Sequence, residues 1–274
     1  NFKETADNGM AAGWAAPQSR STPLFGTGNG TQISGLINDG PVSTWQSQTM
    51  TVQGTATATG VLFVFLLAAA TLGWSLVKTQ AGEVTKFPAW TIAGILVGLG
   101  CVIAVRFKPQ FAKVLGPIYA IAEGIFIGAI SHAYNEYYKG IVIQAVGATI
   151  AVFGVMLFLY HTRIIKVTER FRRIVIGATL GVMLFYGISF LINLFGVNVP
   201  FLSASDNSPL SIIFSFFVAG LAAFNLALNF DFIERGSKAN LPKQMEWVAA
   251  IGLMVTIIWL YLEILRLLAK LQKR

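Results

Sequence analysis

The chain has 274 residues, of which 55% are hydrophobic and only 12% are charged. A charged fraction near half the roughly 25% of soluble proteins cannot cover the apolar surface in water, so the chain needs lipid. This excludes a soluble enzyme, a nucleic-acid binder and, with one cysteine, a disulfide scaffold. The net charge of +8 indicates membrane topology and contact with anionic lipid.

The first part of the chain, residues 1–57, is rich in Gly, Ser, Thr, Asn, Gln and Pro. This composition predicts a polar tail with little secondary structure. The tail lacks the basic start and apolar core of a signal peptide. A long polar tail is a natural docking segment, so a membrane-protein partner or a larger complex could hold it.

Seven long apolar segments follow, and each is close to the 17–25 residues that a helix needs to cross a bilayer. Their runs are continuous and rich in Gly and Ala, which favours helices over strands. We therefore predict an all-α membrane protein, with seven transmembrane helices in one bundle. The expected spans are 58–77, 87–105, 114–132, 141–160, 174–196, 210–233 and 247–268.

Lys and Arg set the expected orientation. The tail and the connections after the second, fourth and sixth spans hold 13 of these residues, whereas the opposite connections hold three. The positive-inside rule places the N-terminus in the cytoplasm. Seven crossings leave the C-terminus outside, although it carries Lys270, Lys273 and Arg274. We expect the last helix to cross; the alternative is a re-entrant segment that returns.

Small residues predict where helices approach closely, and hinges are the alternative interpretation. They are Gly94, Gly98 and Gly100 in the second span, Gly147 and Gly154 in the fourth, and Gly177 and Gly181 in the fifth.

Three carboxylates lie within the predicted spans, where ionisable groups are costly and usually functional. They are Glu123, Asp231 and Glu263. Arg266 follows Glu263 by three residues on the same helix face, which predicts a local ion pair. Glu123 needs a proton or a partner from another helix, and Asp231 either reaches the headgroups or belongs to a polar cluster with Asn225 and Asn229.

Oxygen-rich clusters suit Ca²⁺, and neighbouring carboxylates can share a proton. A pH-gated pore is one interpretation, and a proton-coupled carrier is another. Enzyme signals are poor, because the two histidines, His132 and His161, are expected on opposite sides of the membrane and no catalytic motif is present. We expect no enzyme activity and no cofactor. A basic cluster, Arg170, Arg172 and Arg173, is expected to anchor lipid headgroups.

Several stretches in order resemble one family. They are Gly116-Pro117-Ile118-Tyr119-Ala120 through Glu123 to Ser131-His132, then Leu228-Asn229-Phe230-Asp231, then Trp259-Leu260-Tyr261-Leu262-Glu263-Ile264-Leu265-Arg266. Together they resemble the Bax inhibitor-1 (TMBIM/YccA) family over residues 58–274. Glu246-Trp247 and the closing stretch look like a bacterial, actinobacterial branch, which implies a multi-pass protein of the bacterial plasma membrane.

The resemblance implies a pH-sensitive cation leak, chiefly of Ca²⁺, gated by carboxylates of the sixth and seventh helices. Asp231 matches the first carboxylate and could bind Ca²⁺ transiently. The second is Glu263 by motif, whereas an ungapped alignment places Thr256 there. Glu263 lies 17 residues beyond Glu246, about 25 Å along a helix, so geometry favours Glu246 as the neighbour of Asp231.

A second function is compatible with the same resemblance. YccA-type members are linked to regulation of a membrane protease. The chain would then be a non-conducting accessory subunit that binds a protease or another complex through its tail and helices.

Overall fold

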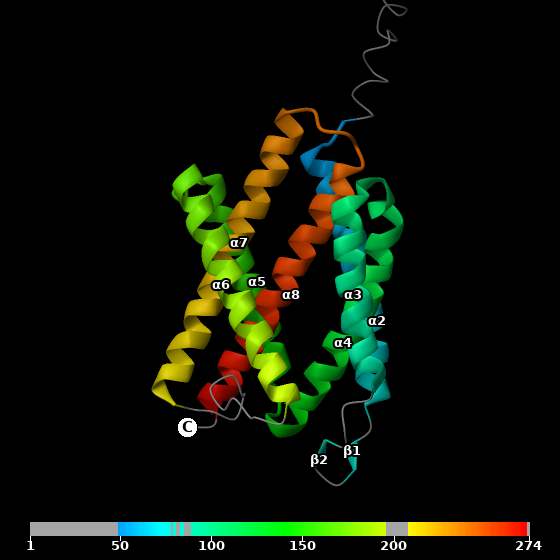
Figure 1. Ribbon diagram of the computed structural model, residues 1–274, viewed down its shortest axis with the longest axis vertical. Coiled ribbons are helices and arrows are strands. Elements are labelled where there is room, and N and C mark those ends of the chain that lie inside the picture. The colour runs from blue at the N-terminus through cyan, green and yellow to red at the C-terminus, as the bar shows by residue number, and fades with distance from the viewer. Residues whose placement is uncertain (1–48, 78, 81–82, 85–88, 196–207, 273–274) are drawn as a thin grey trace, which may run out of the picture. The chain divides into compact units, whose positions relative to one another are not determined.

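The computed structural model describes residues 49–77, 79–80, 83–84, 89–195 and 208–272. Of the predicted tail, only residues 49–57 fall within these ranges, and the rest lies outside the described residues. The described part is helical apart from one short hairpin (Figure 1).

The helices are α2 (Val52–Leu76), α3 (Ala89–Phe107), α4 (Ala112–Tyr137), α5 (Ile141–His161), α6 (Glu169–Leu194), α7 (Pro209–Lys238) and α8 (Met245–Gln272). A 3-10 turn, η1 (Pro109–Phe111), precedes α4, and strands β1 (Thr79–Gln80) and β2 (Glu83–Val84) pair antiparallel. By length and composition, α2 and α4 to α8 are each able to cross a membrane, and the described side chains of α3 form a shorter apolar helix, Ala93–Phe107. The predicted helical membrane bundle is confirmed, and its orientation stays a prediction.

Helix α2 begins at Val52, inside the predicted tail, so that boundary was wrong. The Thr51 hydroxyl caps the helix by accepting a 2.9 Å hydrogen bond from the Gly54 amide. Just before it, the Met50 amide donates to the Leu241 carbonyl at 2.7 Å, and the Met50 side chain is buried. Polar residues therefore form the first turns of α2, because a cap and an apolar anchor hold them.

Helices α6 and α7 are also longer than their apolar segments. Helix α6 begins at Glu169 rather than 174, and α7 ends at Lys238 rather than 233. Charged residues in these turns lower the hydropathy but not the helicity. In α7 they pair along the helix, Asp231 with Arg235 and Glu234 with Lys238, which supports helical turns.

Helix α8 is the central helix of the described bundle. It packs against α2, α4, α5 and α7, and it is the most buried of the long apolar helices. It is unbroken over 28 residues, or about 42 Å at 1.5 Å per residue. A re-entrant segment needs a break, so the structure favours the predicted crossing (Figure 1).

The closest helix approach joins α2 and α4. A Cβ added at Gly73 of α2 would collide with the backbone of α4, and one added at Gly124 or Gly128 of α4 would collide with the backbone of α2. Such contacts let two helices pack backbone to backbone.

Most of the glycines that were predicted to mark close helix approach do not face another helix. Gly94 and Gly98 of α3 do face α4, but the others, Gly100, Gly147, Gly154, Gly177 and Gly181, adjoin open space. That part of the prediction was wrong, because spacing along one helix does not show which face meets a neighbour.

Candidate functional site

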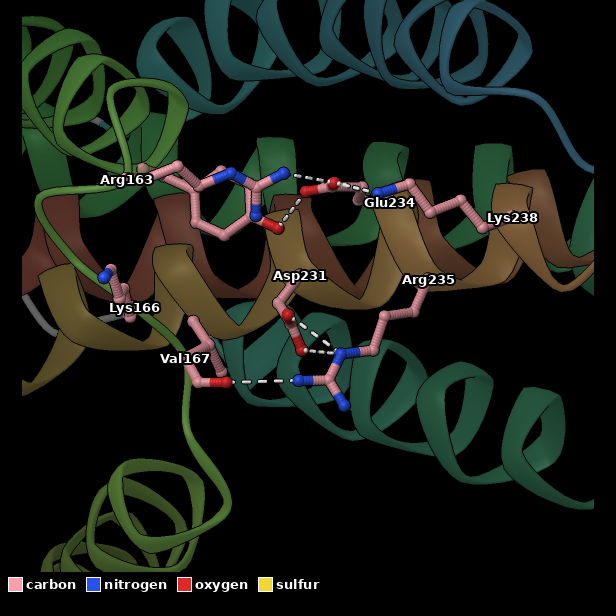
Figure 2. Close-up of a pocket in the computed structure, with 8 residues that line it drawn as sticks. Arg163, Lys166, Val167, Asp231, Glu234, Arg235 and Lys238 are labelled. Carbon is pink, nitrogen blue, oxygen red and sulfur yellow. Dashed lines mark hydrogen bonds and ion pairs between the residues drawn. The ribbon is translucent and has the colours of Figure 1, made fainter.

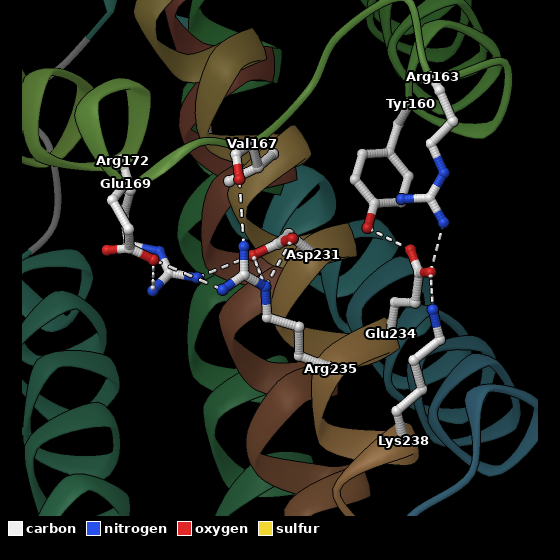
Figure 3. Close-up of polar contacts among 9 residues, drawn as sticks. All are labelled: Tyr160, Arg163, Val167, Glu169, Arg172, Asp231, Glu234, Arg235 and Lys238. Atoms are coloured by element: carbon white, nitrogen blue, oxygen red, sulfur yellow. Dashed lines mark hydrogen bonds and ion pairs between the residues drawn. The ribbon is translucent and has the colours of Figure 1, made fainter.

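The carboxylate of Asp231 is held between two arginines near the end of α7. Arg172 of α6 donates from Nη2 to Oδ2 at 2.9 Å, and Arg235 Nε lies 2.9 Å from the same carboxylate (Figure 3). The Asp231 side chain is only 9% exposed. Arg235 also donates to the Val167 carbonyl at 3.1 Å, so the clamp joins α7 to both α6 and the α5–α6 connection. Glu169 completes the network, with an oxygen 3.3 Å from Arg172.

A second carboxylate, Glu234, lies one turn further along α7. It accepts hydrogen bonds from the hydroxyl of Tyr160, the guanidinium of Arg163 and the ammonium of Lys238 (Figure 3). The hydrogen bond to Glu234, with its negative charge, raises the pKa of Arg163. These contacts attach the end of α5 to α7.

The two carboxylates and four basic side chains line a pocket of about 240 Å³ at the ends of α5 and α7 (Figure 2). The lining residues are Tyr160, Arg163, Lys166, Val167, Asp231, Glu234, Arg235 and Lys238.

Uncharged polar contacts continue from this cluster into the apolar part of the bundle. Asn229 of α7 donates to the Thr256 hydroxyl of α8 at 2.7 Å. Asn225, one turn further into the bundle, donates to the Thr179 hydroxyl of α6 at 2.8 Å. Buried amides and hydroxyls are costly without partners, and here each amide has one on a neighbouring helix.

A further cluster surrounds Glu263, which is 2% exposed. Its Oε1 accepts from the Tyr186 hydroxyl of α6 at 3.0 Å and from Trp259 Nε1 at 3.3 Å. Arg266 Nη1 lies 3.2 Å from both carboxylate oxygens and also donates to Tyr186. The predicted Glu263–Arg266 pair is confirmed, and α6 completes it.

Neither predicted carboxylate partner of Asp231 contacts it. The Asn229–Thr256 bond fixes the antiparallel register of α7 and α8. In that register Glu263 lies nine residues along α8 from the level of Asp231. At a rise of 1.5 Å per residue, this is a separation of about 13 Å along the helix axis. The pairing expected by motif was therefore wrong.

Glu246, the neighbour expected on geometry, has a different role. Its Oε1 accepts from the amide and the hydroxyl of Thr51, at 3.0 and 2.9 Å. Glu246 thus binds the start of α2 to α8. The predicted pairing of Glu246 with Asp231 was also wrong.

Glu123 lies apart from the other predicted site residues. Its carboxylate lies against Gly98 of α3. Among the residues that the structure describes, no side chain forms a hydrogen bond or ion pair with it.

Sequence reasoning missed the residues on α6. Arg172 was expected to anchor lipid headgroups, but it pairs with Asp231, and Tyr186 was not considered. The spacing of Asp231 and Arg235 was the available signal for half of the clamp. Lys270, whose charge argued against a crossing, is 1% exposed and donates to the hydroxyls of Ser211 and Ser215 on α7 at 2.6 and 2.9 Å. The charge of Lys270 is therefore accommodated inside the bundle, and Lys273 and Arg274 lie outside the described residues.

No metal centre is assembled within the described ranges, where three or more His, Cys, Asp or Glu side chains do not converge. In a comparison with known families, the model described as Bax inhibitor 1 like matches residues 6–273. The chain belongs to the Bax inhibitor 1 like family. No curated protein and no solved structure matches the sequence. The family match and the apolar helices together indicate that this Bax inhibitor 1 like protein is a multi-pass membrane protein.

Proposed function

We propose that this protein is a pH-sensitive cation leak channel, chiefly for Ca²⁺, in a bacterial plasma membrane. The observation that carries the proposal is the clamp on Asp231, the carboxylate that matches the family motif. In the described arrangement both of its oxygens face guanidinium groups, so the carboxylate is not available to a cation. The arrangement is that of a closed gate.

The chemistry of the clamp gives the change that would open the gate. The charge of Asp231 holds Arg172 and Arg235, so a neutral side chain at this position would cost α6 one attachment to α7. Loss of that charge, by acid or by substitution, should therefore favour opening. The polar pairs Asn225–Thr179 and Asn229–Thr256 lie along the same α6–α7–α8 contact and offer oxygen atoms to a passing cation.

The test is Ca²⁺ flux into liposomes that hold the purified full-length protein, at about pH 4, near the ordinary pKa of an aspartic acid, and at about pH 7. Wild type should leak more at the lower pH. Asp231→Asn keeps the size of the side chain without its charge, so it should leak at both pH values and lose most of the pH response. The matched control is Glu136→Gln, which removes an ion-paired carboxylate outside the clamp and should behave as wild type.

Two results would count against the channel. If Asp231→Asn kept the wild-type pH response, Asp231 would not be the gate. If no variant gave flux above empty liposomes, the non-conducting accessory subunit would replace the channel as the proposed function.

A further inference from the structure

The pocket beside the Asp231 clamp has a charge that the proposed cation leak does not require. Four basic side chains line it, Arg163, Lys166, Arg235 and Lys238, against two carboxylates. A site built to hold Ca²⁺ would show the opposite balance.

The two carboxylates do not offset the cations at the surface of the pocket. Asp231 is 9% exposed, behind the two guanidinium groups that it accepts from. Glu234 is 23% exposed and accepts from three donors. By contrast, the side chains of Arg163 and Lys238 are 59% and 71% exposed. What the pocket presents to a ligand is therefore chiefly positive charge and N–H donors.

Lys166 strengthens this view. Its side chain is exposed at the pocket, on the α5–α6 connection, and it forms no hydrogen bond or ion pair with any residue that the structure describes (Figure 2). Lys166 can therefore bind a ligand without breaking an existing ion pair. The guanidinium groups beside it suit phosphate oxygens, since their N–H donors are fixed in a plane.

The position of the pocket also fits a phosphate. It lies where the apolar helices α5 and α7 end in charged turns, which is the depth of lipid headgroups. Arg170 and Arg173, both exposed in the first turns of α6, add positive charge to the same end of the bundle.

We propose that the pocket lined by Arg163, Lys166, Arg235 and Lys238 binds the phosphate group of an anionic ligand. A phospholipid headgroup and a free phosphate share this chemistry. Binding does not depend on ion conduction, so it can be tested whether or not the channel proposal holds.

The test uses the full-length protein, delipidated in detergent and titrated with phosphatidylglycerol while native mass spectrometry counts the bound lipids. Phosphatidylcholine serves as the uncharged comparison lipid. Lys166→Gln should bind phosphatidylglycerol about fivefold more weakly than wild type, the factor expected for one basic residue at an anionic surface. Lys166→Glu should weaken binding further. Because the Lys166 side chain is exposed and pairs with none of the described residues, neither substitution should disturb the fold.

The matched control is Lys113→Gln, which removes an exposed lysine near the start of α4, outside the pocket. It should bind phosphatidylglycerol as wild type does. Inorganic phosphate, added at constant ionic strength, distinguishes the two sources. If it displaces the lipid, the pocket takes free phosphate, and if it does not, the pocket takes the lipid headgroup. Equal binding by wild type and both Lys166 variants, or an equal loss in Lys113→Gln, would overturn the proposal.

Discussion

The Glu263–Arg266 pair allows a sharp test of whether a buried carboxylate in this protein is structural or gating. Glu263 is 2% exposed, whereas the Arg266 side chain is 27% exposed. Replacing Arg266 with Met leaves the carboxylate buried with only the Tyr186 hydroxyl and Trp259 N–H as donors. Leaving a buried charge without its partner costs about 3–5 kcal/mol.

The reverse substitution should cost less. Glu263→Gln keeps an oxygen that can accept from Tyr186 and Trp259. Arg266 keeps partial access to solvent and its place over the Tyr186 ring, 5.2 Å from the centroid. A loss of about 1–3 kcal/mol is expected, as for a weakened buried hydrogen bond. The double variant Glu263→Met with Arg266→Met removes both charges, so it should be more stable than Arg266→Met alone.

The free energy of unfolding of the full-length protein in detergent, monitored by tryptophan fluorescence, is compared between wild type and the three variants. The expected order of stability is wild type, Glu263→Gln, then Arg266→Met, with the double variant above Arg266→Met. A double variant no more stable than Arg266→Met alone would refute the buried pair. Glu263→Gln should also keep the pH response of Ca²⁺ flux. If this variant lost the pH response, Glu263 would be part of the gate.

Two further predictions concern packing. Gly128→Ala should lower the unfolding temperature, because its Cβ would meet the backbone of α2 and overpacking costs about 1–3 kcal/mol; Gly147→Ala, which faces open space, should match or exceed wild type. An unchanged Gly128→Ala would argue against the close α2–α4 contact. Thr256→Val should cost about 1–3 kcal/mol by leaving the Asn229 amide without its acceptor, and Thr256→Ser should restore most of that stability. Equal stability of the Val and Ser variants would show that the bond contributes little.

The sequence predicts the helices well because lipid imposes a strong rule. A chain with continuous apolar runs of bilayer length has few alternatives to crossing as helices. The same rule explains the boundary errors at Val52, Glu169 and Lys238. Hydropathy measures where lipid ends, whereas a helix ends where its caps and side-chain pairs end.

The candidate site could be predicted only one helix at a time. The Glu263–Arg266 pair follows from spacing on α8, and it forms as expected. The partner of Asp231 on another helix depends on how α6, α7 and α8 are arranged, which no spacing along the chain reveals. Motif and helix geometry each proposed a carboxylate on α8, and the structure instead gives an arginine on α6.

These contacts make α6 the helix on which a gate at Asp231 would act. Helix α6 is the least buried of the long apolar helices, and its apolar contact with α7 is a small cluster centred on Val175 and Val182. Polar contacts supplement that cluster at successive depths, through Arg172, Thr179 and Tyr186, and Glu169 at the start of α6 pairs with Arg235 of α7. Helix α8, in contrast, is held by extensive apolar packing. Loss of the Asp231 charge would remove the Arg172 contact at the charged end of α6 and leave α8 in place.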